Sequence, residues 1–255
     1  MRRRTRLLGP IAIVLGLGLC GAGPACEGTE VEGTAGIGWF EQERGGCGGS
    51  PTYLYRTQHI GGQARIRHRF RGTGGLLSAS FGATHLKDVA DRLVDPGTDN
   101  PTDPAAPEYE SGGLFLGTLR GGWQWSWLGG ELGFIWGGLT GHDLGNPAPS
   151  GVIWFVPVDG LHLYVSLLED PAVFFRGLVR VGVGYAFDRW SFGLSLGSRT
   201  KLTEGGVAPA DGVNGTLEAE VRIAEAWFVG LGASIASKGV IGPNLSLFGS
   251  FRYVF

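Results

Sequence analysis

The chain has 255 residues, of which 48 are glycine, 11% are aromatic and only 17% are charged. A soluble domain of average composition has about 25% charged residues and about 7% glycine, so this chain is poor in charge and rich in glycine. Composition alone is also compatible with a turn-rich soluble β-sandwich. Its length fits one all-β domain, and its formal net charge of −2 offers no basic excess for binding nucleic acid.

Residues 1–25 have the organisation of a secretory signal peptide. Four arginines lie within residues 2–6, an apolar region follows at residues 7–19, and small residues surround Ala25. The apolar region is too short to span a membrane, which takes about 20 residues. We therefore expect cleavage after Ala25 and a mature domain at residues 26–255, with 17 basic residues against 23 acidic ones.

Two cysteines belong to the predicted mature domain, Cys26 and Cys47. In an oxidising compartment they could form a disulfide, or Cys26 could be lipidated, although the residues before it lack the leucine usual in a lipobox. No cysteine or histidine spacing predicts a metal site, and no motif predicts a cofactor.

Apolar and polar side chains alternate over about ten residues, again and again along the mature chain, with turn residues between the segments. This is typical of membrane-spanning strands. In chain order the segments lie at residues 31–40, 60–71, 77–84, 115–126, 132–136, 152–156, 161–167, 173–187, 190–196, 213–223, 227–235 and 245–255.

The connections between these segments alternate between short and long. Residues 72–75 form a tight turn, whereas residues 87–111 form a long acidic loop, and residues 141–150 and 201–212 form further polar loops. Short turns on one side and long loops on the other are typical of outer-membrane barrels. Large aromatic residues lie beside the short turns, as in an interfacial girdle: Phe70, Trp127, Phe187, Trp190, Trp227 and Phe255.

The final segment, LSLFGSFRYVF, places Leu245, Leu247, Gly249, Phe251, Tyr253 and Phe255 on one face of an extended chain, and the sequence ends on Phe255. It resembles the closing strand of bacterial outer-membrane β-barrel proteins. The resemblance implies an outer-membrane location in contact with lipid and lipopolysaccharide. It also implies that the barrel-assembly machinery recognises Phe251, Tyr253 and Phe255.

We therefore predict an all-β fold, a transmembrane antiparallel up-and-down β-barrel of about 12 strands. Hydrocarbon cannot hydrogen-bond a backbone, so strands cross a bilayer only as a closed barrel. The alternative is a barrel of 10 or 8 strands with an N-terminal plug or tail. In the segment 152–156 the expected apolar face is Val152, Trp154 and Val156.

The polar face of the strands is rich in arginine. The predicted lumen-lining basic residues are Arg65, Arg67, Arg69, Arg71, Arg120, Arg176, Arg180, Arg199 and Arg222, joined by Arg252 in the closing strand. The inward acids expected from the alternation are chiefly Glu131, Glu218 and Glu220. Such a lumen favours small anionic solutes in a narrow, porin-like channel. Alternatively, the arginines pair with acids and carbonyls and fill a closed interior, in a structural or surface-binding barrel.

A barrel enzyme acting on lipid or lipopolysaccharide is the alternative function. Such enzymes need a serine, a histidine and an acidic or amide partner close together. The histidines are His59, His68, His85, His142 and His162, with His59 expected in or beside a loop, and no such grouping is found among them. We therefore predict a non-enzymatic barrel.

Overall fold

A computed structural model describes residues 28–45, 52–94, 112–139, 142–143, 147–169, 178–203, 206–236 and 245–255. Side chains are described at residues 28–39, 57–87, 112–138, 147–169, 178–199, 212–236 and 245–255. The predicted signal peptide, Cys26, Cys47 and Arg176 lie outside these ranges.

Twelve long strands and one two-residue strand make up the described chain. They are β1 (Gly28–Gly45), β2 (Thr52–Arg69), β3 (Gly75–Val94), β4 (Gly112–Gln124), β5 (Leu128–Leu139), β6 (His142–Asp143), β7 (Ala148–Val158), β8 (Leu161–Leu167), β9 (Val179–Phe187), β10 (Trp190–Thr203), β11 (Gly206–Ala224), β12 (Trp227–Ala236) and β13 (Leu245–Val254). Within the described ranges no helix is long and apolar enough to cross a membrane.

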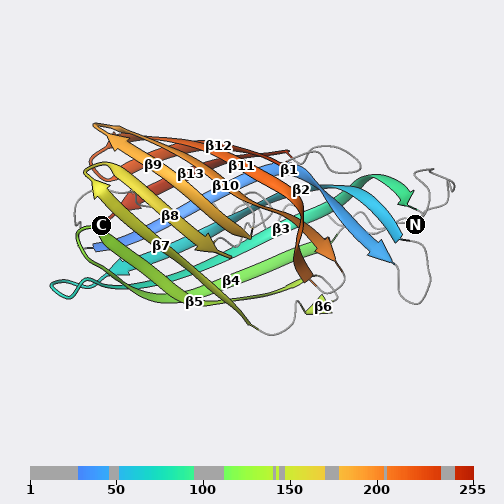
Figure 1. The fold of residues 1–255 in the computed structure, drawn as a ribbon, viewed down its shortest axis with the longest axis horizontal. Coiled ribbons are helices and arrows are strands. Elements are labelled where there is room, and N and C mark those ends of the chain that lie inside the picture. The colour runs from blue at the N-terminus through green and yellow to red at the C-terminus, as the bar shows by residue number, and fades with distance from the viewer. Residues whose placement is uncertain are drawn as a thin grey trace, which may run out of the picture.

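The twelve long strands form a closed antiparallel barrel (Figure 1). Each strand pairs with the next along the chain, and β1 closes the ring against β13, from Glu30↔Val254 to Trp39↔Leu245. The short strand β6 pairs only with the end of β5 among the described strands. The prediction of a 12-stranded up-and-down barrel is confirmed, and the first strand forms part of the wall instead of a plug.

The five tight turns that the structure describes lie at the end of the barrel that holds Gly28 and the C-terminal Phe255, on the left in Figure 1. They connect the strands at residues 70–74, 125–127, 159–160, 188–189 and 225–226. Gly72, Gly74 and Gly160 have φ between +68° and +81°, which glycine adopts without a steric cost. We call this the short-turn end. The connections at the other end run through residues 46–51, 95–111, 140–147, 170–177, 204–205 and 237–244.

The wall of the barrel inverts the usual distribution of side chains, because its apolar residues point outward and its polar residues point inward. In β9, Val179, Val181, Val183, Tyr185 and Phe187 are exposed while Arg180 is buried between them. The same alternation follows β13, where Leu247, Phe251 and Phe255 are exposed and Ser246 and Arg252 are buried. A membrane barrel requires this arrangement, because hydrocarbon solvates apolar side chains.

Strand β7 corrects the predicted orientation of one segment. Ile153 and Phe155 are exposed on the outer wall, whereas Val152 is buried and Trp154 lies under Arg67 inside the barrel. The expected outward face, Val152, Trp154 and Val156, therefore faces the lumen. Both faces of this strand are apolar, so hydrophobic alternation cannot assign its orientation.

Several strands extend beyond the predicted segments. β10 and β11 continue through most of the loop expected at residues 201–212, pairing as far as Thr203↔Gly206. β3 runs to Val94, and so takes in the first part of the acidic loop expected at residues 87–111. Beyond the bilayer, strand pairing needs only backbone hydrogen bonds, so these extensions carry no alternating signal.

Candidate functional site: a charged cluster in the barrel lumen

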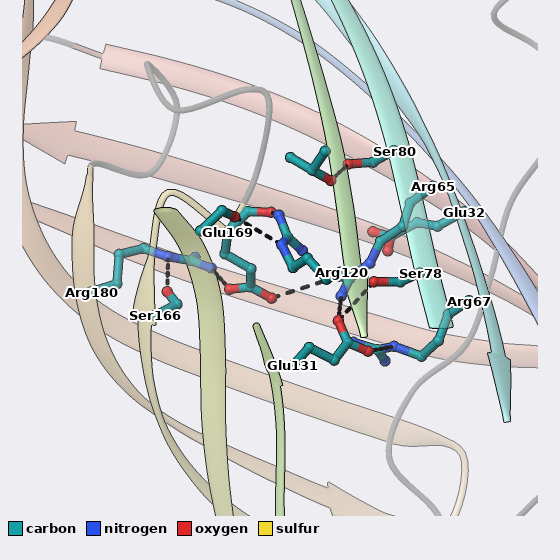
Figure 2. Close-up of polar contacts among 12 residues, drawn as sticks. Glu32, Arg65, Arg67, Ser78, Ser80, Arg120, Glu131, Ser166, Glu169 and Arg180 are labelled. Atoms are coloured by element: carbon teal, nitrogen blue, oxygen red, sulfur yellow. Dashed lines mark hydrogen bonds and ion pairs between the residues drawn. The ribbon is translucent and has the colours of Figure 1, made fainter. Parts of the chain in front are cut away.

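Charged side chains from opposite walls meet inside the barrel. Arg65 and Arg67 come from β2, Arg120 from β4, Glu131 from β5 and Arg180 from β9, while Glu169 follows the end of β8. We call these six residues the lumen cluster (Figure 2). The five strand residues lie at inward positions of the alternation.

Glu131 is the most deeply buried member of the lumen cluster, with no exposed surface. Its carboxylate accepts hydrogen bonds from Arg67 Nε at 2.5 Å, Ser78 Oγ at 2.9 Å and an Arg65 terminal nitrogen at 3.2 Å. Arg67 also lies 3.3 Å from a carboxylate oxygen of Glu30. Two arginines spaced two residues apart on β2 therefore hold one glutamate from β5, across β3 and β4.

Glu169 links the other side of the lumen cluster. Its carboxylate pairs with Arg180 at 2.6 Å and with Arg65 at 3.6 Å. β2 and β9 are not neighbours in the sheet, because β3, β4, β5, β7 and β8 separate them on one side of the ring. This ion pairing therefore bridges the lumen from one wall to the other, as Figure 2 shows.

Arg120 fixes the main chain at this point. Its side chain donates to Ser150 Oγ at 2.8 Å, to the carbonyl oxygen of Leu168 at 3.4 Å and to the carbonyl oxygen of Glu169. Ser150 in turn donates to the carbonyl oxygen of Leu168 at 2.7 Å. Leu168 has a φ of 45°, an uncommon conformation for a residue other than glycine. These bonds hold the turn at Leu168 that directs Glu169 into the lumen.

Apolar side chains pack inside the barrel beside the charged cluster. Leu86, Leu114, Leu116 and Ile135 form a buried group, and Leu168 and Leu178 pack against it. We call these six residues the inner apolar cluster. Two inward aromatic rings also contact arginines, since Arg67 lies 5.7 Å from the ring centre of Trp154 and Arg180 lies 5.5 Å from that of Tyr164.

A second charged group lies on the wall formed by β11 and β13. Arg252 pairs with Glu220 and stacks on Phe228, 3.7 Å from its ring centre. Ser191 also donates to Glu220, at 3.3 Å. Its residues come from β10 to β13, whereas those of the lumen cluster come from β2, β4, β5, β9 and the end of β8.

The structure places the predicted lumen arginines in different surroundings. Arg65, Arg67, Arg120, Arg180, Arg199 and Arg252 lie on the inner side of the wall. Arg69 is half-buried at the last residue of β2, whereas Arg71 lies exposed in the following turn and Arg222 is exposed near the end of β11. The predicted ladder from Arg65 to Arg71 therefore extends into the lumen only over its first members.

The inner wall also carries more acids than the three predicted there. Besides Glu131, Glu218 and Glu220, the structure places Glu30, Glu32 and Glu169 there. Glu30 and Glu32 occupy inward positions of β1, which alternation can identify. Glu169 lies beyond the last alternating residue of its strand, so no periodic signal marks it.

His59 lies within β2 and is fully buried, which corrects the expected position in or beside a loop. Its Nε2 lies 3.1 Å from Ser246 Oγ of β13. This serine–histidine contact lies inside the barrel, away from the lipid-facing surface where a barrel lipase would meet its substrate. In the described part of the chain, no group of three metal-ligating side chains could hold an ion.

The closing strand packs its aromatic residues beside the short turns. Trp227 lies 4.9 Å from Phe251 and 4.4 Å from Tyr253 between ring centres, and Tyr253 lies 4.6 Å from Phe255. The Phe255 amide donates to the carbonyl oxygen of Thr29 at 3.1 Å, so the last residue closes onto β1.

No protein-family model and no curated protein sequence matches the chain. Solved structures do match. The COG4313 outer membrane channel from Pseudomonas putida F1 is 13% identical, with a TM-score of 0.54 over 91% of this chain and 97% of that chain. The KdgM porin (10% identity, TM-score 0.48, 89% and 99% coverage) and Omp33 of Acinetobacter baumannii (10%, 0.40, 90% and 98%) are more distant in shape.

At this identity the similarity to the COG4313 channel establishes the fold alone. The chain has the fold of the bacterial outer-membrane β-barrel proteins.

Proposed function

We propose that the protein is a non-enzymatic channel of the outer membrane, with a narrow lumen that favours anions. The short-turn end faces the periplasm in this proposal, because outer-membrane barrels place short turns there and longer connections outside. The large aromatic residues beside those turns support the same placement.

The lumen cluster is the observation that carries this proposal. It contains four arginines against two glutamates, and the contact between Arg67 and Glu30 adds a third carboxylate. Arg65, Arg67 and Glu169 keep 16%, 22% and 15% of their side-chain surface exposed, so water reaches them inside the barrel. The guanidinium groups of Arg65 and Arg67, which stay in contact with water, attract anions.

The packing of the cluster favours a narrow path. Arg65 and Glu169 meet across the lumen, and Trp154 and Tyr164 fill space beside the cluster. Small barrels are largely filled by their own side chains. The proposed solutes are therefore small anions, and the proposed conductance is low.

Charge reversal on β2 tests the proposal. In a planar bilayer with a salt gradient, the reversal potential of the Arg67→Glu/Arg69→Glu variant should shift from anion-selective towards cation-selective, while the heat-induced gel shift of a folded barrel remains. A folded variant with open-channel currents of unchanged selectivity would show that these arginines do not line the ion path. Loss of stability without any conductance in either protein would indicate a filled barrel with a structural role.

A further inference from the structure

Glu169 lies outside the strands, whereas Glu131, the other acid of the lumen cluster, lies within β5. It follows β8, and three arginines from different strands converge on it. Arg180 and Arg65 contact its carboxylate at 2.6 Å and 3.6 Å, and Arg120 contacts its main-chain carbonyl. The two sets of contacts are separate, one to the side chain and one to the main chain.

The main-chain contacts do not depend on the position of the carboxylate. Ser150 and Arg120 hold the carbonyl oxygen of Leu168, and the Leu168 amide donates to the carbonyl oxygen of Leu178 at 2.7 Å. A rotation of the Glu169 side chain out of the space between Arg65 and Arg180 would leave these backbone hydrogen bonds in place. Partial exposure of Glu169 gives the rotated carboxylate access to water.

A packed apolar group lies immediately beside this carboxylate. Leu168, the residue before Glu169, packs against Leu86, Leu114, Leu116 and Ile135. Leu114 and Leu116 lie on the same inner face of β4 as Arg120. The partly exposed Leu168 and Leu178 therefore adjoin the guanidinium groups that contact Glu169.

We propose that Arg65 and Arg180 form a binding site for the carboxylate of an aliphatic monocarboxylic acid, and that Glu169 occupies this site when no ligand is bound. Leu168 and Leu178, the partly exposed members of the inner apolar cluster, would contact the hydrocarbon chain. This inference rests on the proposed channel function and names its solute class. Replacing one carboxylate by another keeps the charge of the cluster constant, so binding does not bury an additional unpaired charge.

Chain-length dependence tests the site in the wild-type protein. We would titrate detergent-solubilised protein with sodium hexanoate, sodium acetate and hexanamide, and follow binding by calorimetry. Burial of one methylene contributes about 0.8 kcal/mol, or about fourfold in affinity. Hexanoate should therefore bind at least about tenfold more tightly than acetate, and hexanamide should bind much more weakly than hexanoate. Equal affinities for hexanoate and acetate would overturn the assignment.

Glu169→Gln tests the competing carboxylate. Removing its charge should raise hexanoate affinity about tenfold or more, because the ligand no longer displaces an ionised group. Glu220→Gln is the matched control, since it removes a lumen carboxylate from Arg252 at a distance from the inner apolar cluster. It should leave the preference for hexanoate over acetate unchanged. The same gain in both variants, or no gain in Glu169→Gln, would contradict the proposal.

Channel recordings separate this inference from the proposed function. Chloride currents without preferential hexanoate binding would support the channel function and contradict the carboxylic-acid site. Preferential hexanoate binding without any current would support the carboxylic-acid site and contradict the channel function.

Discussion

Glu131 provides the sharpest test of the charged interior, because the substitution Glu131→Gln keeps its volume and removes its charge. The carboxylate is fully buried and accepts bonds from Arg67, Arg65 and Ser78. Removing one partner of a buried ion pair costs about 3–5 kcal/mol. In this variant Arg65 still has its ion pair with Glu169, and Arg67 still has its ion pair with Glu30. Both arginines also retain some exposure to water. We therefore expect a smaller loss in the free energy of unfolding, about 2–3 kcal/mol.

Urea unfolding of the barrel in lipid vesicles, followed by tryptophan fluorescence, measures this loss. Glu225→Gln in an exposed turn is the control and should change stability by less than about 0.5 kcal/mol. The double variant Glu131→Gln/Arg67→Gln should cost less than the two single changes together, because they disrupt one shared interaction. Stability of Glu131→Gln equal to that of the control would refute a lumen organised around this glutamate.

Three further predictions concern assembly, the lipid-facing wall and the cysteines. Phe255→Asp should sharply reduce the heat-modifiable barrel in membrane fractions, and normal assembly would show that the final aromatic residue is not the recognition element. Leu231 lies at the middle of β12 and is 72% exposed on the outer wall. Leu231→Arg places a charge there and should lower the free energy of unfolding in vesicles by about 2–4 kcal/mol. Unchanged stability would argue against lipid contact at this position. Mass spectrometry should find no intramolecular Cys26–Cys47 bridge, because the ends of β1 near these residues lie at opposite ends of the barrel, whereas a disulfide needs Cα atoms within about 7 Å.

Much of the wall was predictable from alternation, because the bilayer and the polar lumen select opposite side chains on the two faces of each strand. β9 shows this most clearly, with its exposed valines and aromatic residues on either side of Arg180. β7 shows the limit of the method. Val152 and Trp154 are as apolar as Ile153 and Phe155, so only the pairing with β5 and β8 reveals which pair faces lipid.

The lumen cluster was predictable in part. Alternation identifies Arg65, Arg67 and Glu131 as inward residues, but it does not show that β2 and β5 bring them into contact across two intervening strands. That contact depends on the tilt and curvature of the closed barrel, which are properties of all twelve strands together. Glu169 was missed because it lies after the end of β8, where neither periodicity nor a turn motif marks a functional side chain.

The central claim is that ions cross the lumen and that anions cross more readily. A recording from wild-type protein in a planar bilayer under a potassium chloride gradient tests it directly. We predict small single-channel currents whose reversal potential has the sign of chloride selectivity. Currents with cation selectivity, or a folded and inserted barrel that passes no current, would contradict the claim.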